Sequence, residues 1–311
     1  MQRELTPDER ADALAASQHS AISHRQALDV GLTRTQIRQR RTSGRWRAAC
    51  HGVYVLAGAP ASWQQRAMVA CLAGPDGTVA SYLTAAALFG LAKAPLVPHV
   101  TVPRGSSGRF RRAVVHKATL DRGDVGVVDG MPCTRPARTL VDCAGIMGFD
   151  QLCELVDPAI CRDLTDPSRL RTAAARAARG PGRKGLSVLE EVLLVWVGPR
   201  PGSPAEMRLL RRLIGWGFPQ PERQVVITDE QGAFLGRVDL AWADRRFGFE
   251  YDGAEFHTPR RWESDDARQY AIEAMGWRIE RVDKFDLRQS STRLRELLAP
   301  IFVDRVHPQV A

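Results

Sequence analysis

Two short stretches near the carboxyl end of the chain alternate polar and apolar residues. They read Arg237-Val-Asp-Leu-Ala-Trp242 and Phe247-Gly-Phe-Glu-Tyr-Asp252, and a period of two predicts a half-buried β-hairpin. Folding this hairpin about the turn between the stretches places Asp239 opposite Glu250, with the apolar side chains together on the other face. Like charges about 5 Å apart across a hairpin destabilise it. The sequence therefore predicts a partner that compensates the acidic face.

A divalent cation held between the two carboxylates is the simplest candidate for that partner, since hard cations prefer oxygen ligands. An ordinary ion pair is the alternative, in which Asp239 binds Arg237 or Arg246 of the same hairpin. The residues alone leave both open.

The length and charge of the chain indicate how many domains it has and what kind of partner it binds. The 311 residues exceed one typical hydrophobic core and indicate two or three domains. Lysine and arginine number 44 against 35 acidic residues, so the net charge is +9. That excess favours a polyanionic partner, most often nucleic acid, although a surface adjusted for solubility has the same composition.

The cysteines and the amino terminus predict a cytoplasmic protein without a membrane partner. No apolar run approaches the ~18 residues of a membrane span, and the first residues lack the apolar core of a signal peptide. The cysteines form no C-x-x-C pair and have no zinc-finger spacing, so we interpret them as core residues of a reducing compartment. They are Cys50, Cys71, Cys133, Cys143, Cys153 and Cys161.

Residues 20–58 have the pattern of a winged helix-turn-helix. A short helix ends at Gly31, and Thr33 is a suitable N-cap for a second helix that Gly44 terminates. A hairpin pattern follows from Trp46 to Leu56, with a turn near residues 51–52. Two helices followed by a β-ribbon are typical of DNA-binding modules.

The second of these helices is strongly basic. Between Ser23 and Arg47 there are seven arginines and a single acid, Asp29. Three of the arginines recur at i, i+4 and i+7 and so share one helix face, and two more follow in the ribbon. A cationic stripe of this kind suits phosphate and groove contacts, although a solvated helix without a ligand would have it too. The predicted DNA contacts are Arg34, Arg38, Arg41, Arg45 and Arg47.

The remaining chain predicts an α/β fold in two further parts. Residues 59–198 have mixed strand and helix patterns that end in a low-complexity linker. Residues 199–311 have the order helix, strand, hairpin, helix, strand, helix, beginning with a helix that Ser203 caps and Pro204 opens. We therefore divide the chain into a winged helix at 1–58, a mixed segment at 59–198 and a C-terminal α/β domain at 199–311.

The first half of the chain resembles a known family in two places. The segment Gln26-Ala-Leu…Gly31-Leu-Thr…Ser43-Gly-Arg-Trp46…His51-Gly-Val-Tyr54 is similar to the N-terminal winged helix of AbiEi-type antitoxins. The string Gly130-Met-Pro-Cys-Thr-Arg-Pro-Ala-Arg-Thr-Leu-Val-Asp142 resembles the segment that follows it there. The resemblance implies binding to promoter DNA and allows a toxin protein as a partner.

The last hundred residues resemble the PD-(D/E)XK nuclease fold. More closely, they look like an uncharacterised family related to very short patch repair endonucleases. The resemblance rests on several motifs in the same order: Glu206, Arg237-Val-Asp-Leu-Ala-Trp242, Glu250-Tyr-Asp-Gly253, His257, Arg268 and Gly276-Trp277.

This second resemblance implies a role for each matching residue. Asp239 and Glu250 would ligate Mg²⁺ or Mn²⁺, and Glu206 would complete or orient the metal shell. The ion would lower the pKa of a bound water and neutralise the scissile phosphate. His257 would move a proton, and Arg268 would hold a phosphate or pin a carboxylate. Each residue also has an ordinary structural alternative. Glu206, for example, could simply be an acidic first-turn residue that the helix dipole stabilises.

One position departs from the nuclease pattern. The fold usually has a lysine two residues after its glutamate, and here that position is Asp252. The aspartate would add a metal ligand or pair with Arg237, and Lys284 would supply a cation from elsewhere.

The expected function is a DNA-binding, metal-dependent endonuclease in defence, repair or toxin–antitoxin regulation. Two alternatives stay open. One is a non-catalytic DNA-binding antitoxin or transcriptional regulator with a degenerate nuclease fold, and the other is an antitoxin that neutralises a partner toxin.

Overall fold

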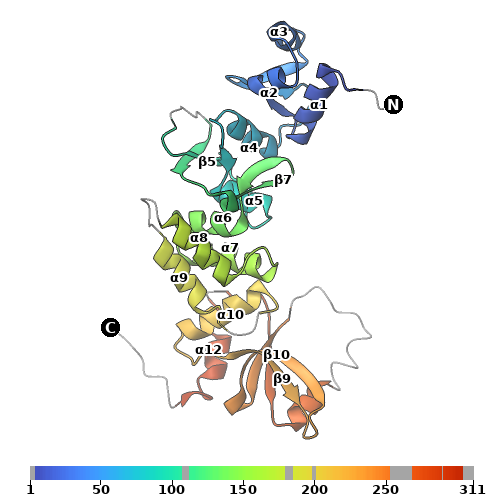
Figure 1. Ribbon diagram of the computed structural model, residues 1–311. Helices are drawn as coiled ribbons and strands as arrows, with labels where there is room; N and C mark the ends of the chain where they lie inside the picture. Colours follow the sequence, from blue (N-terminus) through green and yellow to red (C-terminus); the bar gives the residue numbers. More distant parts are fainter. Residues whose placement is uncertain are drawn as a thin grey trace. The chain divides into compact units, whose positions relative to one another are not determined.

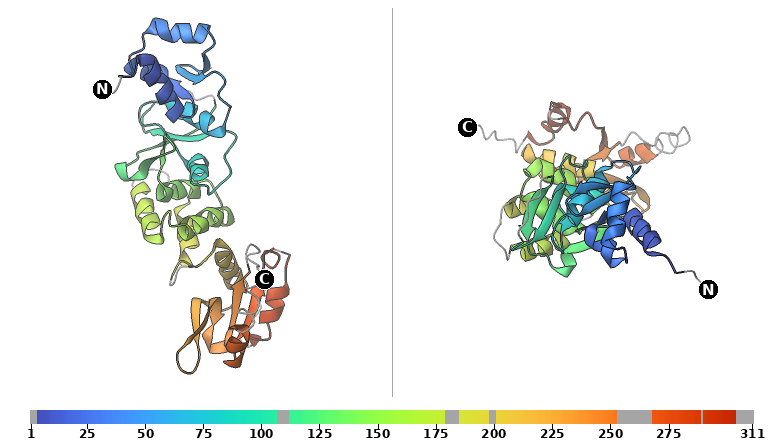
Figure 2. Two further views of the ribbon diagram at one scale, coloured as in Figure 1. Left: turned by 90° about the vertical axis from the view of Figure 1, so that its right-hand side faces the viewer. Right: turned by 90° about the horizontal axis from the view of Figure 1, so that it is seen from above.

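The computed structural model describes residues 4–106, 112–178, 185–197, 201–252, 268–288 and 290–303 (Figures 1 and 2). Three sheets and the helices around them make an α/β fold, as predicted. The chain divides into two compact units, Met1–Val192 and Leu193–Ala311, where the sequence analysis divides it after residues 58 and 198. Within the described ranges, no helix is long and apolar enough to cross a membrane.

The first unit begins with the predicted helix-turn-helix and ribbon. Ser23 and Thr33 cap the two helices, and each accepts a hydrogen bond from the backbone N–H three residues on. A short strand that the sequence analysis missed joins the ribbon, in the sheet order β1-β3-β2. The elements are α1 (Pro7–Ser17), β1 (Ala21–Ser23), α2 (His24–Asp29), α3 (Arg34–Thr42), β2 (Trp46–Cys50) and β3 (Val53–Leu56).

A five-stranded mixed sheet follows in the same unit, in the order β6-β5-β4-β8-β7. Strands β5 and β6 are parallel, as are β4 and β8, whereas the other neighbours are antiparallel. The elements are α4 (Trp63–Leu72), β4 (Val79–Ala80), α5 (Tyr82–Leu88), β5 (His99–Pro103), β6 (Val114–Ala118), η1 (Arg122–Asp124), β7 (Val125–Val128) and β8 (Met131–Thr134).

Four helices complete this part of the chain: α6 (Pro136–Ala144), α7 (Phe149–Cys161), α8 (Pro167–Ala177) and α9 (Leu186–Leu194). Helix α6 packs against α5, α7 and α8 in the green region of Figure 1.

The winged helix and the five-stranded sheet share one core. Ala21 and Val55 of the three-stranded sheet pack in the same buried cluster as Met68 of α4 and Met131 of β8. The turn before β8 also comes close to the end of α1, because a Cβ on Gly130 would overlap the carbonyl of Ser17. Residue 58 therefore lies in the middle of a continuous packed body.

A buried ionic network lies where η1, α6 and α8 meet. Asp124 is 1% exposed and accepts hydrogen bonds from Arg138 at 3.1 Å and from Arg176 at 2.8 Å. Arg138 also donates to Asp142 at 2.8 Å. Burial raises the pKa of Asp142 to about 6, although Arg138 opposes the shift. These groups are stable inside the protein because each charge has a partner.

The second unit has the predicted order of elements around a four-stranded sheet, β12-β11-β10-β9. Strands β9 to β11 form an antiparallel meander, and β12 pairs with β11 in parallel. Residues 268–274 are helical, and His257 and the predicted start of that helix lie outside the described residues. The elements are α10 (Pro204–Gly215), β9 (Glu222–Thr228), β10 (Phe234–Trp242), η2 (Ala243–Arg245), β11 (Phe247–Tyr251), β12 (Arg278–Val282) and α12 (Arg293–Leu298).

Removing Arg138 should destabilise the first unit strongly. Arg138→Ala leaves two buried carboxylates short of a partner, a change that typically costs about 3–5 kcal/mol. Arg169→Ala is the matched control, because Arg169 is 69% exposed in its pair with Asp166 and such pairs contribute about 0–1 kcal/mol. Urea unfolding of the full chain measures both, and equal midpoints for the two variants would contradict the prediction.

Candidate nucleic-acid interface and candidate catalytic site

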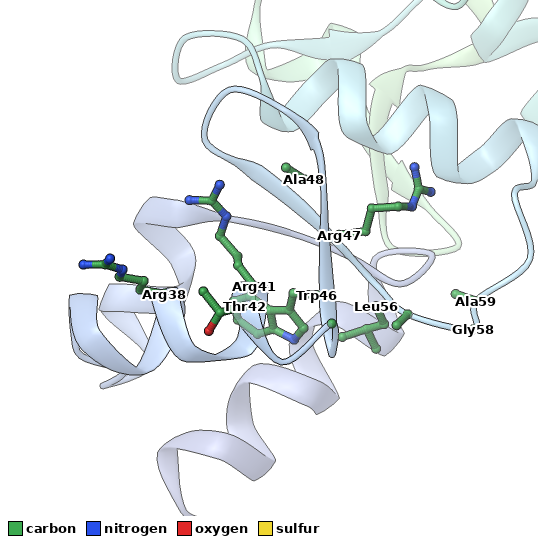
Figure 3. Close-up of a pocket in the computed structure, with 11 residues that line it drawn as sticks. Arg38, Arg41, Thr42, Trp46, Arg47, Ala48, Leu56, Gly58 and Ala59 are labelled. Atoms are coloured by element: carbon green, nitrogen blue, oxygen red, sulfur yellow. The ribbon is translucent and has the colours of Figure 1, made fainter.

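The first candidate site is the basic face of α3. The buried side chain of Ile37 anchors this helix in the core, while Arg34, Arg38 and Arg41 are exposed. Arg38 and Arg41 line an open hollow of about 670 Å³ together with Arg47 of β2 (Figure 3). Within the described part of the chain, no acidic side chain pairs with these arginines. The structure thus places three of the five predicted contacts around one hollow without acidic partners, and Arg34 is exposed on the same helix.

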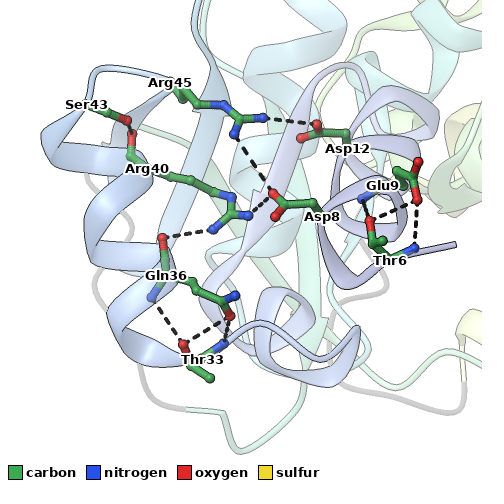
Figure 4. Close-up of polar contacts among 9 residues, drawn as sticks. All are labelled: Thr6, Asp8, Glu9, Asp12, Thr33, Gln36, Arg40, Ser43 and Arg45. Atoms are coloured by element: carbon green, nitrogen blue, oxygen red, sulfur yellow. Dashed lines mark hydrogen bonds and ion pairs between the residues drawn. The ribbon is translucent and has the colours of Figure 1, made fainter.

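Arg45, the fifth predicted contact, is held by acids of α1. It lies 3.5 Å from Asp12 and 4.0 Å from Asp8 (Figure 4). Asp8 also pairs with Arg40, which is 5% exposed and donates to the Gln36 carbonyl at 2.9 Å. Helix α1 therefore neutralises Arg40 and Arg45 and leaves the outer face of α3 positive.

The second candidate site begins at Glu206, in the first turn of α10. Ser203 caps this helix by accepting a hydrogen bond from the Glu206 N–H at 3.2 Å. The Glu206 carboxylate is 5% exposed and accepts a hydrogen bond from the Gly202 N–H at 2.8 Å. Burial raises the pKa of Glu206, and the nearby charge of Asp239 raises it further.

Gln224 joins Glu206 to Asp239 and was missed by the sequence analysis. Its Nε2 atom donates to Glu206 Oε2 at 2.9 Å and to Asp239 Oδ1 at 3.1 Å. Gln224 has a left-handed backbone, φ +53°, inside β9. Strain of this kind in a residue other than glycine is often found at functional sites. Gln224 follows two other polar residues, Glu222 and Arg223, in the same strand, so nothing in the sequence singles it out.

Asp239 interrupts the predicted alternation of the hairpin. The paired residues of β10 and β11 have the predicted register, and the pairs end at Leu240 and Phe249. Beyond them, the Asp239 carboxylate accepts a hydrogen bond from the Tyr251 N–H at 2.9 Å. The prediction of one shared apolar face is wrong at Val238, which packs with Ala241 in a different cluster. At this point of the hairpin, a side-chain oxygen of β10 accepts the hydrogen bond of a β11 N–H.

Glu250 has its own cationic partner. Arg268 contacts the Glu250 carboxylate at 2.5 Å and donates to the Arg237 carbonyl at 3.3 Å. Gly236 leaves room for this guanidinium, since a Cβ there would lie 2.6 Å from Arg268 Nε. Arg268 therefore binds a carboxylate, which is one of the two roles predicted for it.

Asp252 and His257 complete the predicted set. Asp252 is half-buried at the end of β11, where its N–H donates to the Val282 carbonyl at 2.8 Å. His257 lies outside the described residues. Arg246, an alternative partner for Asp239, donates instead to the Met275 carbonyl at 3.0 Å.

The donor chemistry of this site fits a hard divalent cation in part. Glu206 and Asp239 offer oxygen ligands, and a single amide nitrogen lies between them. Among the residues that the structure describes, no three His, Cys, Asp or Glu side chains form a group able to hold a metal ion. The carboxylates of Glu206 and Asp239 therefore come together, and the third, Glu250, is paired with Arg268.

Fold and sites together define a two-unit α/β protein with a winged helix-turn-helix in its first unit and an acidic sheet in its second. No family model matches the chain. It is 30% identical over 226 residues to the uncharacterized protein MT2308 of Mycobacterium tuberculosis strain CDC 1551. The same values hold for the uncharacterized protein Rv2248 of strain H37Rv. The match covers 71% of this chain and 80% of each mycobacterial protein, and the chain belongs to their family.

Replacing Glu206 by glutamine should change how stability depends on pH. A carboxyl whose pKa is raised by folding keeps its proton in the native state at pH values where the unfolded chain, with a pKa near 4.5, has lost it. Its contribution to the free energy of unfolding therefore falls as pH rises. Glu206→Gln removes that loss, so its advantage over the parent should grow as the pH rises above the unfolded pKa and level off once native Glu206 has lost its proton.

Urea unfolding of the full chain at several pH values measures this difference. Glu222→Gln, at an exposed position of β9, is the matched control and should leave the pH dependence unchanged. A Glu206→Gln curve parallel to that of the parent protein would contradict the pKa assignment.

Proposed function

We propose that this protein binds DNA through α3 and the ribbon of its first unit. The observation that carries the proposal is the hollow lined by Arg38, Arg41 and Arg47, whose positive charge no described acid offsets. Arg34 is exposed on the same helix. The second helix of a helix-turn-helix enters the major groove, and arginines beside it contact phosphates and base edges. The acids of α1 engage Arg40 and Arg45, which supports a structural role for those two.

Salt dependence tests this interface. Each lost phosphate contact reduces the slope of log K against log salt by about 0.9. Arg38→Ala with Arg41→Ala should therefore weaken duplex binding and make the slope shallower by about 1–2. Arg169→Ala with Arg171→Ala removes the same charge from α8 and should leave the slope almost unchanged. Equal slopes for the two double variants, measured by fluorescence anisotropy, would refute the interface.

We further propose that the second unit hydrolyses phosphodiester bonds. Glu206, Asp239 and Glu250 would hold Mg²⁺ or Mn²⁺, which when bound would polarise the phosphate and activate a water molecule. Glu206 and Asp239 lie close enough to share the Gln224 donor, and this proximity supports the pair as oxygen ligands of one ion. Gln224 would orient both carboxylates, and Arg268 would offer a cation to the substrate phosphate.

A non-catalytic regulator is the second candidate, and one observation favours it. The ion pair between Glu250 and Arg268 at 2.5 Å, together with the Gln224 amide, compensates the acidic face without an ion. Such a protein would bind DNA and leave it intact. A toxin partner rests on the sequence resemblance alone.

Metal dependence separates the two candidates. The full chain with Mn²⁺ should nick supercoiled plasmid, and Asp239→Asn should reduce nicking to the level without metal, because the residues left would hold the ion too weakly for it to activate water. Asp244→Asn, an exposed acid in the turn of the same hairpin, is the matched control and should stay active.

Metal should also raise the thermal unfolding midpoint of the parent protein and of Asp244→Asn, but not that of Asp239→Asn, since a ligand stabilises only the state that binds it. No nicking and no metal-induced stabilisation in the parent would select the regulator.

A further inference from the structure

The turn after β12 is fixed by its own hydrogen bonds. Asp283 Oδ1 accepts from the N–H groups of Phe285 at 2.7 Å and of Asp286 at 3.1 Å. Asp286 Oδ2 in return accepts from the Asp283 N–H at 3.1 Å and from Arg293 at 2.7 Å. Asp286 is buried, so it anchors the turn in the protein. The turn thus presents Phe285 in a defined position.

Phe285 is a large apolar ring on the surface, flanked by two cations. It is 50% exposed. Lys284 Nζ lies 5.3 Å and the Arg288 guanidinium carbon 4.4 Å from the ring centroid. Within the described residues, no acid pairs with Lys284 or Arg288. Both cations lie over the ring, so a base that stacks on the exposed half of Phe285 would take their place and leave them to bind its phosphates.

This aromatic turn adjoins the candidate catalytic carboxylates. Phe285 and Arg281 line a hollow of about 340 Å³ that Asp252 also lines. Asp252 follows Glu250 by two residues, which is about 7 Å along a strand. Strands β11 and β12 are parallel, so their carboxyl ends lie at one edge of the sheet. A strand of nucleic acid on Phe285 would therefore pass beside Glu250.

We propose that Phe285, Lys284 and Arg288 form a stacking platform for an unpaired base of a nucleic-acid strand. The inference rests on the proposed hydrolytic function, and it names single-stranded or locally unpaired DNA as the substrate of that site. A base inside a duplex already stacks on both faces, so an unpaired base can lie on the ring without the cost of unstacking. Lys284 and Arg288 contact the phosphates of the same strand.

Binding without cleavage tests the platform. The full chain, carrying Arg38→Ala and Arg41→Ala to suppress the first interface, is titrated in EDTA against a labelled single-stranded oligonucleotide. An abasic strand of equal length serves as the second probe. Phe285→Ala should weaken binding to the normal strand roughly 5- to 100-fold and hardly affect the abasic strand. Phe285→Trp should retain binding.

Phe234→Ala is the matched control, because Phe234 is also an exposed ring in the second unit, and it should not change binding. An equal loss on both strands, or no loss with Phe285→Ala, would overturn the platform.

The titration needs no metal, so its result is independent of the nicking assay. If the protein does not nick DNA but Phe285→Ala weakens binding to the normal strand alone, the hydrolytic function is rejected and the platform is retained as a binding site. If the protein nicks DNA but Phe285→Ala binds both strands as the parent does, the platform is rejected and the hydrolytic function is retained.

Discussion

The second unit depends on how one amide is shared by two carboxylates. Glu206 has almost no contact with water and lies near another acid, an arrangement that normally opposes folding. The two N–H groups of the Gln224 amide satisfy one oxygen of each carboxylate, at 2.9 and 3.1 Å. The left-handed backbone of Gln224 belongs to the same arrangement, which accepts local strain to keep both carboxylates in place.

Local signals in the sequence predicted much of the fold. Caps at Thr33 and Ser203 define helix starts, and the period of two defines the β10–β11 hairpin and its register. Short strands such as β1 and β4 were missed because three or two residues contain no period. They are strands only because residues far along the chain pair with them.

The candidate sites were predictable in part for the same reason. Helical spacing found the exposed arginines of α3, but nothing local connects Arg45 to Asp12, 33 residues earlier. Arg40 did leave a signal, since it follows the buried Ile37 by three residues and so faces the core. The carboxylates of the hairpin were found from their alternation and Arg268 from the family resemblance, whereas Gln224 becomes a partner only in three dimensions.

The shared core of the first unit bears on how this protein can be divided. A fragment that stops after β3 would expose Ala21 and Val55, which the five-stranded sheet covers in the full chain. It would also lose the turn at Gly130 that rests on the end of α1. A winged helix grafted alone onto another protein would therefore carry these apolar side chains uncovered.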